Sequence, residues 1–125
     1  MDTEEFSNLE KKATLSWLLA FYGGLLTDNQ QEMARLYWEE DYSLGEIAEQ
    51  FSVSRQSVHD TVTRTEKKLE AWEGKLGMLQ RFQRIETGLN ACKDELNSVK
   101  AAGDTENHLL AARRLIETLL DQEEE

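Results

Sequence analysis

The residues whose types and spacing suggest a function lie between Ser43 and Lys68. Two capping residues, Ser43 and Ser54, each precede a stretch with apolar helical patterning, and a three-residue turn joins the stretches. This arrangement predicts a helix-turn-helix over about residues 43–65. The beginning of the second helix of such a motif enters the major groove of duplex nucleic acid. The candidate nucleic-acid-binding residues on this helix are Arg55, Gln56, Ser57, His59, Arg64, Lys67 and Lys68.

These side chains divide into two groups by the contacts that they could make. Arg55 and Gln56 stand at the helix start, where side chains reach base edges. Arg64 and the lysine pair 67–68 come later and are available to backbone phosphates, although the solvated face of any long helix could carry such a cluster. Asp60 stands among them, and its carboxylate repels phosphate.

No group of residues in the sequence predicts an active site. The two histidines, His59 and His108, fall on separate predicted helices, with no serine or cysteine predicted as a partner. Cys92 is the only cysteine and falls on an apolar position, so we expect a small buried side chain. The glycines at 23–24 are not followed by the lysine and hydroxyl residue of a phosphate loop. We therefore predict that the protein is not an enzyme and needs neither a cofactor nor a metal.

The elements that position the motif are all predicted to be helices. The chain has no proline, so no helix need be interrupted by one. Apolar residues repeat at helical spacing over residues 9–22, and glycines at 23–24 end that stretch. Capping-box patterns predict further helices over 28–39 and 44–51. Together with the start of the helix at Arg55 they predict a head over residues 9–70.

An apolar heptad rhythm predicts a long helical arm over residues 71–121. Apolar positions alternate in steps of four and three over 58–79, and the rhythm resumes over 85–99. We expect a kink or short break near the glycines at 74 and 77, and a turn at 103–104. So small a head cannot cover this apolar stripe. Either the last helix folds back on it or a second chain covers it, and we favour a homodimer that uses both.

The charge balance of the chain is acidic. The 125 residues carry 25 acidic and 14 basic side chains, a net charge of −11, with acidic tails over 1–8 and 122–125. Such a balance is unusual for a nucleic-acid-binding protein. A single cysteine excludes an internal disulfide framework, and no apolar run approaches the roughly 20 residues of a membrane helix. No secretion signal is evident, so we expect a cytoplasmic protein without membrane insertion.

The head resembles known DNA-binding modules. Region 4 of bacterial sigma factors is similar, in both helices and the turn, to LLTDNQQEMARLYWEEDYSLGEIAEQFSVSRQSVHDTVTRTEKKLE, residues 25–70. The YlxM family resembles more closely the part from DYSLGEIAEQ onward, with LLTDNQ before it, and this resemblance covers about residues 12–80. That family comprises small bacterial helix-turn-helix proteins whose genes neighbour those of the signal recognition particle GTPases. The resemblance implies a three-helix head of the DNA- or RNA-binding type and partners among signal recognition particle components.

Two functions remain open at the level of the sequence. Arg55, Gln56 and His59 match positions at which sigma region 4 contacts DNA, which favours a nucleic-acid-binding regulatory or accessory protein. Asp60 stands where sigma factors have an uncharged polar residue, and Ser57 where promoter readers often have arginine. These departures and the acidic charge favour the alternative, a protein-interaction adaptor that does not bind nucleic acid. The ligand is therefore DNA, structured RNA or protein.

Overall fold

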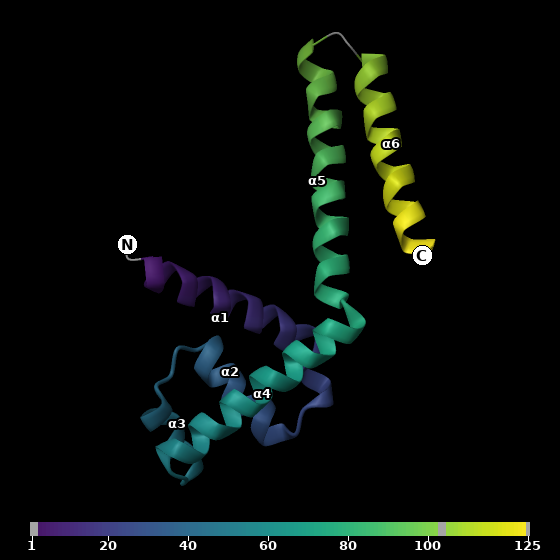
Figure 1. Ribbon diagram of the computed structural model, residues 1–125. Helices are drawn as coiled ribbons and strands as arrows, with labels where there is room; N and C mark the ends of the chain where they lie inside the picture. The colour runs from purple at the N-terminus through teal and green to yellow at the C-terminus, as the bar shows by residue number, and fades with distance from the viewer. Residues whose placement is uncertain (1–2, 103–104, 125) are drawn as a thin grey trace. The chain divides into compact units, whose positions relative to one another are not determined.

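The computed structural model describes residues 3–102 and 105–124, and these residues form α-helices and one short 3-10 turn, with no strand (Figure 1). The elements are α1 (Thr3–Tyr22), η1 (Gly23–Leu25), α2 (Asp28–Trp38), α3 (Leu44–Phe51), α4 (Arg55–Leu76), α5 (Met78–Ala102) and α6 (Thr105–Glu124). The prediction of an all-α fold is confirmed. The predicted turn at 103–104 lies outside the described residues.

The chain divides into two compact units, Met1–Leu79 and Gln80–Glu125. The first unit contains α1 to α4, and the second contains most of α5 together with α6. The predicted head over residues 9–70 lies within the first unit, where α4 continues without a break through residue 70. α1 begins at Thr3, several residues before the apolar repeat that led us to expect it.

Side-chain caps determine where the helices of the first unit begin. Thr27 and Ser43 each form a complete capping box with the residue three positions later, as predicted. The Ser54 hydroxyl accepts a hydrogen bond from the Ser57 N–H at 3.0 Å, which fixes the start of α4 at the predicted position.

The core of the first unit is formed where one face of α4 packs against α1, α2 and α3. The largest fully buried side chains are Tyr22, Ile47, Val58, Thr65 and Leu69. The apolar side of α4 is thereby committed to the core, and its polar side chains face solvent. This division decides which residues of α4 are available to a ligand.

A short break separates α4 from α5, as predicted for the glycines near residue 74. Gly77 ends α4 with φ 60° and ψ 29°, a left-handed conformation that glycine adopts without strain. The buried Tyr22 hydroxyl donates to Glu73 Oε1 at 2.7 Å and accepts from the Met78 N–H at 3.1 Å. Glu73 Oε1 also accepts from the Leu79 N–H at 3.0 Å, so the first N–H groups of α5 are satisfied.

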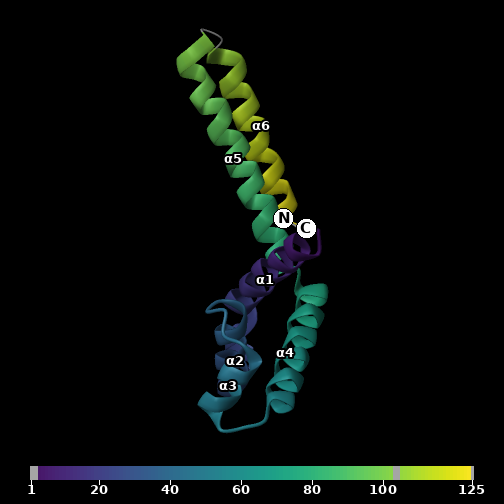
Figure 2. The same cartoon turned by 90° about the vertical axis from the view of Figure 1, so that its left-hand side faces the viewer.

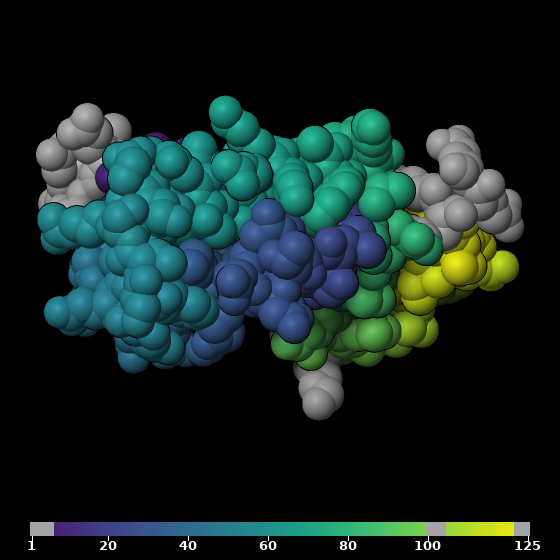
Figure 3. Space-filling view, turned by 90° about the horizontal axis from the view of Figure 1, so that it is seen from below, coloured from purple at the N-terminus to yellow at the C-terminus, as the bar shows by residue number. Residues whose placement is uncertain are grey.

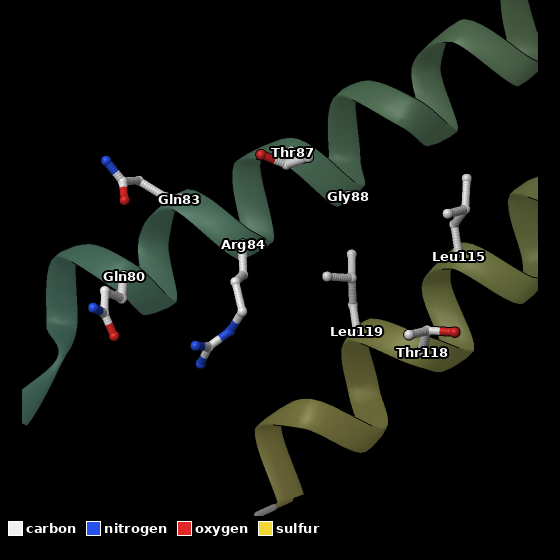
Figure 4. Close-up of a pocket in the computed structure, with 8 residues that line it drawn as sticks. All are labelled: Gln80, Gln83, Arg84, Thr87, Gly88, Leu115, Thr118 and Leu119. Atoms are coloured by element: carbon white, nitrogen blue, oxygen red, sulfur yellow. The ribbon is translucent and has the colours of Figure 1, made fainter.

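In the second unit, α5 and α6 lie side by side and antiparallel in both ribbon views (Figures 1 and 2). The register is marked by three contacts: Gly88 with Leu119, Cys92 with Ala112 and Glu95 with His108. Figure 4 shows Leu119 of α6 pointing toward Gly88 of α5, which has no side chain to exclude it. The last helix therefore folds back along α5, which is one of the two ways in which the apolar arm was expected to be covered.

Candidate nucleic-acid interface

The predicted helix, turn and second helix are all present between Leu44 and Leu76. Ser52 ends α3 in a left-handed conformation with φ 55°, and the Val53 N–H donates to the Ala48 carbonyl at 3.0 Å. This backbone conformation and this hydrogen bond reverse the chain within three residues. Ile47 of α3 and Val58 of α4 are fully buried, so the two helices share a core at the crossing.

The predicted side chains at the beginning of α4 are all exposed. They are Arg55, Gln56, Ser57 and His59. In the space-filling view of Figure 3, the blue-green atoms of α3 and of the beginning of α4 form one exposed surface. The start of α4 is therefore accessible to a macromolecular ligand.

Asp60 binds the two side chains that flank it on the exposed face of α4. The Gln56 amide donates from Nε2 to Asp60 Oδ1 at 2.9 Å, and His59 Nδ1 lies 3.7 Å from the same oxygen. A carboxylate only accepts hydrogen bonds, so the Gln56 amide must use its N–H₂ group here. The middle of this face therefore presents oxygen acceptors and a negative charge.

Arg55 turns back over α3. Its guanidinium packs on Gly45, where an added Cβ would lie 2.9 Å from the Arg55 Nε. The exposed side chains of Glu46 and Glu49 border the same shallow groove. Glu46 accepts a hydrogen bond from the Ser43 N–H at 3.1 Å, and this bond lowers the pKa of Glu46.

Four exposed cations line one side of α4, and they form what we call the basic stripe: Arg64, Lys67, Lys68 and Lys75. Positions three, four and eleven residues apart fall on one side of an α-helix, and eleven residues span roughly 16 Å. Within the described residues, none of the four makes an ion pair. Lys75 is not among the residues that the sequence predicted, although its spacing of eleven residues from Arg64 places it on the same side of the helix.

The carboxylates in the second half of α4 lie on a different edge, which faces α1. Glu66 Oε1 lies 2.8 Å from Lys11 Nζ of α1, and this contact raises the pKa of Lys11. Glu70 adds to the same effect, and Glu73 binds the Tyr22 hydroxyl. The charges of α4 are therefore sorted: acids face α1, and the basic stripe faces solvent.

The remaining residues of chemical interest have structural partners. Cys92 is buried, and its Sγ lies 3.5 Å from the Ala112 carbonyl. His108 Nδ1 lies 2.8 Å from a Glu95 carboxylate oxygen. Across residues 3–102 and 105–124, no three His, Cys, Asp or Glu side chains gather in a way that could hold a metal ion. No helix in the same ranges is long and apolar enough to cross a membrane.

Comparison with known proteins gives one family and several close relatives. Residues 9–108 match the model of the UPF0122 family, described as "Putative helix-turn-helix protein, YlxM / p13 like". The UPF0122 protein YlxM of Bacillus subtilis is 42% identical over 112 residues, which cover 90% of this chain and 96% of that protein. A UPF0122 protein of Halalkalibacterium halodurans is 40% identical over 111 residues, or 89% of this chain and 98% of that protein. A UPF0122 protein of Geobacillus sp. (strain WCH70) is 48% identical over 86 residues, which cover 69% of this chain and 78% of that protein.

Proposed function

Since the chain belongs to the UPF0122 family of YlxM/p13-like helix-turn-helix proteins, we propose that it is a cytoplasmic nucleic-acid-binding regulatory or accessory protein. The observation that carries this proposal is the exposed, unpaired basic stripe on the helix whose beginning is also exposed. The resemblance of the head to sigma region 4 supports the same use of α4.

In the proposed complex the two halves of α4 have different tasks. The beginning of the helix enters the major groove, where Gln56 and His59 meet the base edges, and Arg55 joins them by leaving its contact with Gly45. Arg64 and its neighbours on the basic stripe contact phosphates along one strand. Ser57 stands between the two groups, where its hydroxyl reaches a phosphate or a base edge.

Groove geometry favours duplex DNA over duplex RNA as the ligand. The major groove of B-form DNA is about 12 Å wide and admits an α-helix, whereas the deep, narrow major groove of A-form RNA does not. An RNA ligand would have to offer a distorted or widened groove. We therefore take duplex DNA as the primary ligand and structured RNA as the alternative that the experiment must distinguish.

Salt-dependent binding tests the proposal. Fluorescence anisotropy titrations would compare a mixed-sequence DNA duplex with an RNA hairpin at several salt concentrations. Each phosphate contact contributes about 0.9 to the slope of log K against log salt for B-form DNA. The double substitution Lys67→Ala with Lys68→Ala should therefore reduce the slope by about two. Arg114→Ala, which removes an exposed cation from α6, should leave the slope unchanged.

Three outcomes of these titrations would contradict or redirect the proposal. If the wild-type protein binds neither DNA nor RNA at low salt, α4 does not serve as a nucleic-acid interface. Equal losses for the Lys67/Lys68 and Arg114 variants would show non-specific attraction only. Tighter binding to the hairpin than to the duplex would identify RNA as the ligand.

The alternative function, a protein-interaction adaptor without nucleic-acid binding, draws support from Asp60. This carboxylate and the exposed Glu46 and Glu49 would suit a cationic protein surface better than phosphates. The family resemblance names signal recognition particle components as such partners. A complex with one of these components that is lost on Asp60→Gln, with no nucleic-acid binding, would favour this alternative.

A further inference from the structure

The hairpin of α5 and α6 exposes a row of large apolar side chains. We call this row the apolar ladder: Leu89 (55% exposed) and Leu96 (50%) on α5, and Leu109 (49%), Ile116 (48%) and Leu120 (59%) on α6. Charged and polar side chains are the usual occupants of such exposed helical positions. Five large apolar residues at exposed positions of two paired helices therefore require an explanation.

All members of the ladder lie on the same face of the hairpin. The residue immediately before each ladder residue contacts or faces the other helix. For example, Leu89 comes directly after Gly88, and Leu120 comes directly after Leu119. An α-helix turns by about 100° per residue, so each ladder residue points roughly a quarter-turn away from the neighbouring helix. Because α5 and α6 are antiparallel, the two quarter-turns lead to the same side. The register places Leu89 level with Ile116 on that side.

The hairpin buries little apolar surface of its own. Among the described residues of Gln80–Glu125, only Cys92 and Ala112 are buried. Isolated helices gain most of their stability from packing an apolar face against another element. The ladder is therefore the main apolar surface that this unit has available for further burial.

We infer that the apolar ladder is covered by the ladder of a second copy of this chain, which gives an antiparallel four-helix bundle with two-fold symmetry. Ten half-exposed side chains, five from each copy, would bury on the order of 1,000 Å², the area at which specific interfaces begin. The inference concerns the hairpin alone and does not rest on the proposed nucleic-acid binding.

The charges beside the ladder support a second copy as the occupant. Glu86 lies three positions before Leu89, and Lys93 lies four positions after it. Both are exposed, and neither has an ion-pair partner among the described residues. If the two α5 helices cross antiparallel about Leu89, the Glu86 of each copy meets the Lys93 of the other. A pattern that is complementary to itself under a two-fold rotation is what an isologous interface requires.

The same charges disfavour the other two-fold arrangement of the hairpins. If α5 lay over α6 of the second copy, the hairpin register would bring Glu86 near Asp121 and Lys93 near Arg113. Like charges would then meet at both ends of the interface, which costs affinity. The geometry points to α5 against α5.

Sedimentation equilibrium of the full chain tests the ladder. The wild-type protein should be a dimer at micromolar concentration. Leu89→Lys places two ammonium groups at the centre of the interface and should weaken the dimer at least about a hundredfold. Leu110→Lys is the matched control, because Leu110 is 44% exposed on the outer side of α6, away from the ladder. Since both positions are exposed, circular dichroism should show unchanged helix content in both variants.

A charge exchange tests the orientation. Glu86→Lys and Lys93→Glu should each weaken the dimer about threefold to tenfold, and the double variant should regain the wild-type affinity. A wild-type monomer at about 100 μM, or a dimer unaffected by Leu89→Lys, would overturn the inference. Failure of the double variant to recover, with both single variants weakened, would overturn the antiparallel α5 arrangement.

Discussion

At the scale of single residues, Asp60 determines what the start of α4 offers a ligand. It holds the Gln56 amide at 2.9 Å and places a negative charge where phosphates would approach. Asp60→Asn keeps an oxygen that can accept from Gln56 and removes the charge. We expect it to bind duplex DNA about fivefold more tightly at low salt, which corresponds to about 1 kcal/mol.

The control for Asp60→Asn is Asp94→Asn, which removes an exposed carboxylate from α5 and should leave the affinity unchanged. Anisotropy titrations of the two variants measure the difference directly. Weaker DNA binding by Asp60→Asn would mean that the carboxylate itself contacts the ligand, as it would if it accepted hydrogen bonds from exocyclic amino groups.

Removal of the Tyr22 hydroxyl should lower the stability of the first unit. This buried hydroxyl donates to Glu73 and accepts from the Met78 N–H, so Tyr22→Phe removes both hydrogen bonds and leaves the Met78 N–H without this acceptor. The free energy of unfolding should fall by about 1–3 kcal/mol in urea titrations. Tyr42→Phe, at an exposed position, should change it by less than about 0.5 kcal/mol.

The Tyr22 effect should depend on pH in a defined direction. Burial, and next the hydrogen bond to Glu73, raise the pKa of Tyr22 above its ordinary value of 10.0. A raised pKa in the folded state means that the contribution to stability is complete below pH 10.0 and is lost as the pH rises further. The difference between wild type and Tyr22→Phe should therefore be constant at neutral pH and shrink only in strong alkali.

At the scale of the elements, two glycines in long helices should respond to alanine in opposite ways. A Cβ at Gly88 would lie 2.6 Å from Leu119 Cδ1, so Leu119 must leave its place between α5 and α6. A Cβ at Gly74 would meet nothing within 4 Å. Alanine at position 74 should stabilise α4 by up to about 1 kcal/mol, whereas alanine at 88 should destabilise the hairpin by about 1–2 kcal/mol.

Native-state hydrogen exchange separates these two effects, because it reports the opening of α4 and α5 individually. Slower exchange in α5 after Gly88→Ala would contradict the close packing of Leu119 on this glycine.

The helix starts could be predicted because caps are local. Thr27, Ser43 and Ser54 bond to N–H groups only three residues away, so the sequence carries the whole pattern. The break at Gly77 is equally local. The bond between Tyr22 and Glu73 joins residues 51 positions apart, and no spacing rule could indicate it.

The candidate site was only partly predictable. The exposure of Arg55, Gln56 and His59 follows from helical periodicity, and the structure agrees with it. The packing of Arg55 on Gly45 depends on the angle between α3 and α4, which the sequence does not encode in any short pattern. The hydrogen bond between Gln56 and Asp60 could have been predicted from the sequence, because residues four apart on a helix are neighbours.

At the scale of the whole molecule, the net charge of −11 and the basic stripe are compatible because the charges are segregated. Acidic residues gather near both chain ends and on the edge of α4 that faces α1, and the stripe stays unpaired. Long-range repulsion should slow association with DNA at low salt, while the local stripe supplies the contacts. A nucleic-acid ligand is therefore expected to contact α4.

The most direct test is an NMR titration of the isotope-labelled full chain with a mixed-sequence DNA duplex at low salt. The proposed function predicts that the largest amide shifts fall on α4, at residues 55–59 and along the basic stripe from Arg64 to Lys75. The amides of α6 should remain unchanged. Shifts confined to α1 or to the hairpin, or no shift at any DNA concentration, would contradict the assignment of α4 as the nucleic-acid interface.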